Sequence, residues 1–73
     1  MHNLHPAEQR ARLRVMRAIA QLHCGLRAAD LCSLLAQAEF DPGALAPALE
    51  ALDRLAPVDR RRVLASYARL DRP

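Results

Sequence analysis

The 73-residue sequence contains no lysine and no tryptophan, and it has one phenylalanine, one tyrosine, two cysteines and two glycines. With Gly25 and Gly43 as the two glycines, a glycine-rich phosphate-binding loop is excluded. No stretch approaches the roughly 18 consecutive apolar residues of a membrane-spanning helix. The charged first residues are followed by more arginine, with no apolar run, so no secretory signal is expected. These features predict a cytoplasmic protein with reduced thiols.

Hydrophobic residues are abundant, at 52% of the chain, which favours a folded domain over a disordered one. Most of them are alanine and leucine, and alanine contributes little buried area. A chain of this length also buries only about 60% of the surface that it exposes when unfolded. Extra burial through a homodimer is therefore expected.

All eleven basic residues are arginine, a bias that the codons of a GC-rich genome can produce without any functional cause. Their distribution is more informative than their number. The segments 1–27 and 60–73 each have a net charge of +4, whereas the segment 28–59 has a net charge of −5. The chain is therefore basic at both ends and acidic in the middle.

Prolines mark the expected starts of helices, because the first helical position needs no N–H partner. Pro6, Pro47 and Pro57 each suit that position, and Gly25 suits the position after a helix end. No segment has the alternation that is typical of a strand. The sequence thus predicts a single all-α domain, a compact bundle of four short helices with frayed residues at 1–4 and 71–73. The predicted helices cover about 6–23, 27–38, 46–55 and 57–70.

The first helix is predicted to have a narrow polar stripe formed by Arg10, Arg14, Arg17 and Gln21. The remaining apolar arc is wider than one neighbouring helix needs. Part of this arc is therefore predicted to form the homodimer interface. The interface residues are Val15, Ile19 and Leu22.

Metal binding has weak support in the sequence. His23, Cys24 and Cys32 are the ligand types that lie near one another, but a structural zinc site needs four ligands and usually a paired spacing. His2 or His5 would have to supply the fourth ligand. We therefore expect no metal and no other cofactor, with both cysteines serving as small buried apolar residues.

Catalytic arrangements are equally scarce. Ser33 and Ser66 fall inside predicted helices with no base nearby in the sequence, and no nucleophile-elbow motif occurs. Glu50 and Asp53 share one face of a short surface helix, which offers no cleft between them. The sequence therefore predicts a protein that is not an enzyme.

The segment 27–55 has the leucine spacing of a degenerate helix-turn-helix, which would make the protein a transcriptional regulator that binds nucleic acid. The second helix of that pair carries Glu50 and Asp53, with Arg54 near its end. Recognition helices usually present arginine, lysine or amide side chains to base edges, and phosphate repels an acidic helix. We therefore keep nucleic-acid binding as the alternative function.

The stretch 57–67, PVDRRRVLASY, places three arginines in the first turn of the last helix, where the helix dipole disfavours cations. Three explanations stay open for these arginines: they are solvated, they pair with the acidic middle of the chain, or they contact a partner. Arg60 is expected at the edge of the bundle, with Arg61 and Arg62 facing outward. The preferred hypothesis is a small non-enzymatic regulator or adaptor, bacterial or phage-borne, that binds an acidic protein partner. Its predicted contact residues are Arg10, Arg14, Arg17, Arg61 and Arg62.

Overall fold

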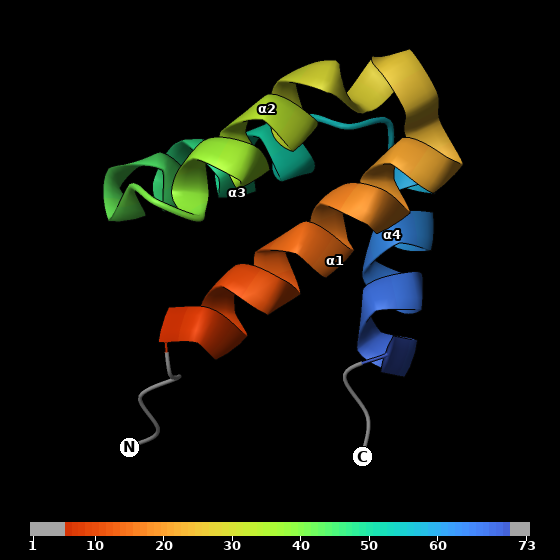
Figure 1. The fold of residues 1–73 in the computed structure, drawn as a ribbon. Coiled ribbons are helices and arrows are strands. Elements are labelled where there is room, and N and C mark those ends of the chain that lie inside the picture. Colours follow the sequence, from red (N-terminus) through yellow and green to blue (C-terminus); the bar gives the residue numbers. More distant parts are fainter. Residues whose placement is uncertain (1–5, 71–73) are drawn as a thin grey trace.

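The computed structural model describes residues 6–70, which form helices joined by short turns and contain no strand, as the sequence predicts (Figure 1). The predicted fraying at 1–4 and 71–73 falls outside the described residues. In chain order the elements are α1 (Pro6–Cys24), the 3-10 turn η1 (Gly25–Ala28), α2 (Ala29–Ala38), the 3-10 turn η2 (Pro42–Ala44), α3 (Leu45–Asp53) and α4 (Pro57–Leu70).

The ends of α1 and the start of α4 follow the local sequence signals. Pro6 and Pro57 are the first residues of α1 and α4, as expected. Gly25 adopts a φ of 56°, a left-handed conformation that ends α1 and favours glycine over residues with a Cβ. The predicted helix 27–38 is shorter than expected, because residues 25–28 form η1 and α2 begins at Ala29.

The turn between α2 and α3 uses the expected Asp-Pro-Gly chemistry. The backbone N–H of Gly43 donates to Asp41 Oδ1 over 2.9 Å, which caps η2. The predicted first position of Pro47 is wrong, because α3 begins two residues earlier at Leu45. Proline is tolerated there because N–H groups throughout the first helical turn lack intrahelical partners.

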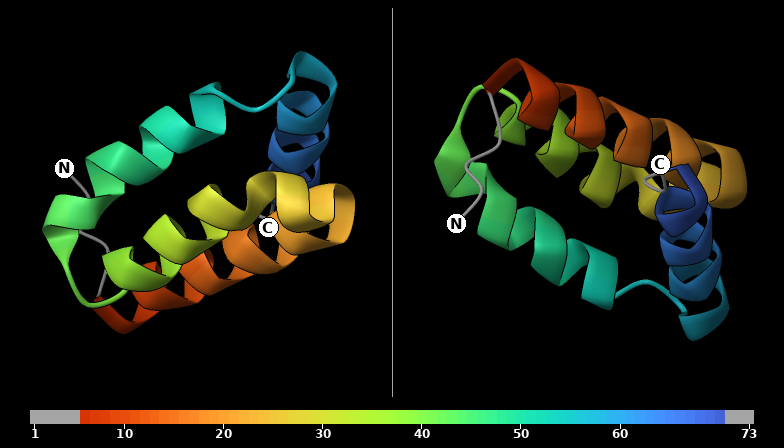
Figure 2. Two further views of the ribbon diagram at one scale, coloured as in Figure 1. Left: turned by 90° about the horizontal axis from the view of Figure 1, so that it is seen from above. Right: turned by 90° about the horizontal axis from the view of Figure 1, so that it is seen from below.

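The four helices form a bundle that is open on one side. α1 and α2 lie side by side at its centre, and α3 packs on α2 while α4 packs on α1. In Figure 2, α3 starts at one end of this central pair and runs back alongside it, and a short turn joins α3 to α4, which crosses the other end. Each outer helix therefore has one main partner, and the four helices do not form a closed four-helix bundle.

The core consists of residues that share the inner faces of all four helices. Leu31 and Val63 are the largest fully buried side chains, and Ile19 belongs to the same cluster with an exposed fraction of 7%. Ile19 is therefore packed inside the single chain and presents little surface to a second copy. Val15 and Leu22 remain exposed, at 37% and 81%.

Among the described residues, no helix combines the length and the apolar character needed to cross a membrane.

Candidate functional site

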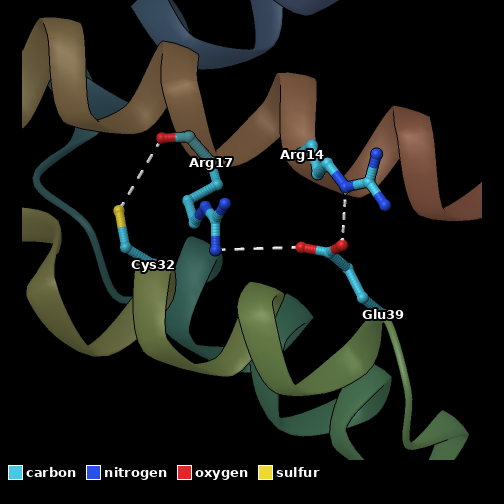
Figure 3. Close-up of polar contacts among 4 residues, drawn as sticks. All are labelled: Arg14, Arg17, Cys32 and Glu39. Carbon is cyan, nitrogen blue, oxygen red and sulfur yellow. Dashed lines mark hydrogen bonds and ion pairs between the residues drawn. The ribbon is translucent and has the colours of Figure 1, made fainter.

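Two arginines predicted to bind a partner lie in an ion-pair cluster between α1 and the end of α2 (Figure 3). Arg14 Nε donates to Glu39 Oε1 over 2.8 Å, and Arg17 Nη1 lies 3.7 Å from Glu39 Oε2. The Glu39 side chain is only 6% exposed. A carboxylate at the C-terminal end of a helix meets the negative end of the helix dipole, and the two guanidinium groups offset this repulsion. Arg14 and Arg17 therefore contribute to the fold.

A first prediction tests this structural role. Glu39→Gln should lower the free energy of unfolding by roughly 1 kcal/mol, because a nearly buried acceptor loses the charge that attracts the exposed Arg14 and the half-buried Arg17. Urea denaturation followed by circular dichroism measures the change. Glu50→Gln is the control, since Glu50 is exposed and makes no ion pair in residues 6–70. Equal stability of the two variants would contradict the assignment.

A second ion pair, missed by the sequence analysis, joins the turn after α1 to the first turn of α4. Arg27 donates through Nε to Asp59 Oδ2 over 2.9 Å and through Nη2 to Asp59 Oδ1 over 3.0 Å. The same Nη2 donates to the carbonyl oxygen of His23 over 3.3 Å. Asp59 is buried. The sequence offered one signal of this burial: Asp59 lies four residues before the apolar Val63, so the two residues share a helix face.

The hydrogen bonds from Arg27 are the main reason why the pKa of Asp59 lies below its usual value. Burial opposes this shift, whereas the positive charges of Arg27, Arg62 and His23 add to it. Asp59 is therefore ionised and occupied by Arg27. Its carboxylate does not leave a free negative charge on the surface of α4.

The remaining arginines of α4 have different roles. Arg60 is half-buried, and its Nη1 lies 4.0 Å from Oδ1 of the exposed Asp53, which makes a weak pair. Arg61 and Arg62 are exposed, so the predicted orientations of all three arginines are confirmed. Within residues 6–70, the side chains of Arg61 and Arg62 form no hydrogen bond and no ion pair, and the same is true of the exposed side chain of Arg69. The outer side of α4 thus carries three arginines that form no ion pair with a carboxylate among the described residues, although the charge of Arg62 helps to lower the pKa of Asp59.

The expectation that Ser66 has no base nearby is corrected by the structure. His23 Nε2 and Ser66 Oγ share a hydrogen bond of 2.8 Å between α1 and α4. Ser66 lies inside a regular helix, where the backbone N–H groups are used by the helix itself and supply no oxyanion site. We therefore interpret the pair as a polar tie between two helices.

Both cysteines are free and buried. Burial raises the pKa of each thiol, and the charge of Asp59 also raises the pKa of Cys24. The thiols are thus protonated, which makes them poor nucleophiles and poor metal ligands. In the part of the chain that the structure describes, no three His, Cys, Asp or Glu side chains come close enough to hold a metal ion.

An apolar groove of about 270 Å³ lies on the open side of the bundle. Leu13 and Met16 of α1, Leu49 of α3 and Tyr67 of α4 contribute to its walls, and Leu31 is part of its floor. Leu49 is half-exposed. The groove is present because α3 packs on α2, so that other apolar side chains of α3 stay uncovered.

The described residues define a small all-α bundle with an arginine-rich outer face on its last helix. In comparisons with protein-family models, curated proteins and solved structures, nothing matched this chain.

Proposed function

We propose that this protein is a small, non-enzymatic regulator or adaptor that binds an acidic surface on a protein partner through α4. The supporting observation is that some charged side chains form ion pairs within the chain and others do not. Glu39 and Asp59 are paired with arginines of the first half of the chain, whereas Arg61, Arg62 and Arg69 have no such partner in residues 6–70. Exposed charges of one sign guide a complementary partner and raise its association rate.

Relative to the sequence-based hypothesis, the proposed contact surface moves away from α1. Arg14 and Arg17 are engaged by Glu39, while Arg10 stays half-exposed at the edge of the α1 stripe. The binding surface proposed here consists of Arg61, Arg62 and Arg69. Self-association remains a proposal, with the exposed Val15 and Leu22 of the predicted interface as its support.

Nucleic-acid binding through α3 receives less support. Glu50 and Asp53 are exposed on α3, and no arginine lies inside this helix, since Arg54 follows its last residue. An exposed acidic helix is repelled by phosphate groups. In the alternative function, the arginines of α4 would be the residues that contact nucleic acid. The experiment below distinguishes this function from protein binding.

The test compares two double variants with the same loss of charge. Arg61→Gln/Arg62→Gln removes the proposed contacts, and Arg10→Gln/Arg54→Gln removes two other arginines. The probes are a fluorescent glutamate-rich peptide and a single-stranded DNA oligonucleotide, each followed by anisotropy at several salt concentrations. We expect the first variant to weaken peptide binding roughly 3- to 10-fold, mainly through the association rate, and the second to change it less.

The same experiment contains the outcomes that contradict the proposal. Equal weakening by both variants would mean that net charge, and not the α4 surface, controls binding. Two results together would favour the nucleic-acid alternative. The DNA would bind more tightly than the peptide, and the slope of log DNA affinity against log salt concentration would become shallower by about one to two units in the first variant. Thermal melting of the first variant should equal that of the unmodified protein, because both side chains are exposed and form no hydrogen bond and no ion pair within residues 6–70.

A further inference from the structure

Two arginines of the proposed binding surface, Arg62 and Arg69, also line a basic hollow between α4 and α1. Figure 1 shows how α4 crosses the C-terminal half of α1. The hollow has a volume of about 340 Å³ and is open to solvent on one side. Arg62, Ser66 and Arg69 line it from α4, and His23 lines it from α1. No carboxylate belongs to its walls, and the nearby Asp59 is occupied by Arg27.

The spacing of the α4 residues brings their polar groups to one side of the helix. Arg62, Ser66 and Arg69 follow one another at intervals of four and three residues, which are neighbouring positions on a helix surface. The hydrogen bond between His23 and Ser66 holds the floor of the hollow in place. The hollow is therefore lined by two guanidinium groups and by a hydroxyl that is hydrogen-bonded to an imidazole.

This set of donors indicates the chemistry of a ligand. A carboxylate has two oxygens, and one guanidinium can satisfy both of them in a bidentate contact. With His23 Nε2–H as the donor to Ser66 Oγ, the hydroxyl proton of Ser66 is available to a ligand. Two guanidinium groups and this hydroxyl match a group with three terminal oxygens and a double negative charge. A phosphate monoester has these properties near neutral pH.

We propose that the hollow formed by His23, Arg62, Ser66 and Arg69 binds a phosphate monoester dianion, with the two arginines contacting its terminal oxygens and Ser66 contacting a third. This inference deepens the proposed function, since it rests on α4 as the binding surface and adds the chemical group that the partner or a small ligand presents there. A free phosphate and a phosphorylated side chain share this chemistry.

The test is an NMR titration of the full chain at constant ionic strength and constant pH. The probes are inorganic phosphate, a short peptide that contains one phosphoserine, the same peptide without phosphate, and a dinucleotide whose one phosphodiester carries a single negative charge. The ring signals of His23 and the side-chain N–H signals of arginine report on the hollow. We expect saturable shifts with phosphate or with the phosphopeptide, and none with the unmodified peptide.

Two charge-matched variants assign the site. Arg62→Gln/Arg69→Gln should weaken binding at least 10-fold, whereas Arg10→Gln/Arg54→Gln removes the same charge outside both the hollow and the proposed binding surface and should change it less than about 3-fold. Ser66→Ala keeps both arginines and should weaken binding by an intermediate factor. Backbone signals of each variant show that the fold is retained. Equal effects of the two double variants, or equal binding of the dinucleotide and the phosphopeptide, would overturn the inference.

Failure of this inference is distinguishable from failure of the proposed function. If the glutamate-rich peptide binds through Arg61 and Arg62 but neither phosphate nor the phosphopeptide shifts the His23 signals, the phosphate site is disproved and the protein-binding proposal stands. If phosphate or the phosphopeptide binds in the hollow while the glutamate-rich peptide binds nowhere on α4, the phosphate site stands without that proposal.

Discussion

Leu31→Ala should lower the free energy of unfolding by about 2–5 kcal/mol, because removal of a large side chain leaves a cavity that its neighbours fill only in part. Leu31 is 2% exposed and lies in the central helix α2. A domain of this size has a total stability of roughly 4–11 kcal/mol at the usual value per residue. A single substitution is therefore expected to remove a large share of the stability.

Leu26→Ala is the matched control for this prediction. It removes the same atoms from a leucine that is 93% exposed in η1, and a surface change of this kind usually stays within about 0.5 kcal/mol. Urea denaturation of both variants, followed by circular dichroism, gives the comparison. Similar midpoints for the two variants would mean that α2 does not form the centre of the core.

Asp59→Asn should lower the melting temperature by several degrees, the second-largest effect that we expect. The substitution removes the charge that accepts two hydrogen bonds from Arg27, and this pair connects the end of α1 to the start of α4. Asp53→Asn removes the same charge from an exposed carboxylate whose one close arginine is 4.0 Å away. The control should therefore melt close to the unmodified protein.

The pH dependence provides an independent measurement of the same contact. The pKa of Asp59 is lowered in the folded state, so its contribution to stability is complete above the pKa of the unfolded state, near 3.9. This contribution is lost as the pH falls below that value and through the lower pKa of the folded state. Unfolding measured between pH 6 and pH 2 should show a steeper acid loss for the unmodified protein than for Asp59→Asn. Parallel acid losses would contradict the assignment.

Local sequence signals were sufficient for the helices but not for their polar contacts. Proline and glycine preferences act within one or two residues, so Pro6, Gly25 and Pro57 marked boundaries that the structure confirms. Pro47 misled the analysis, because the whole first turn of a helix accepts proline. Helical periodicity also placed Arg61 and Arg62 outward, since the orientation of a side chain follows directly from its position on the helix.

The ion pairs depend on which helix faces meet, and periodicity contains no such information. Arg14 and Glu39 are 25 residues apart, Arg27 and Asp59 are 32 residues apart, and His23 and Ser66 are 43 residues apart. The charge pattern along the chain did indicate that the basic ends and the acidic middle could attract each other. It could not show that Arg14 and Arg17 would be engaged while Arg61 and Arg62 would stay exposed.

The single main partner of each outer helix, α2 for α3 and α1 for α4, has a consequence for the motions of this protein. Separation of α3 or of α4 breaks one main helix–helix interface, whereas separation of α1 or of α2 breaks two. Segments with fewer packed neighbours open at a lower free energy than the whole domain does. Local unfolding should therefore begin at the outer helices, and the amide hydrogens of α3 and α4 should exchange with solvent while those of α1 and α2 remain protected.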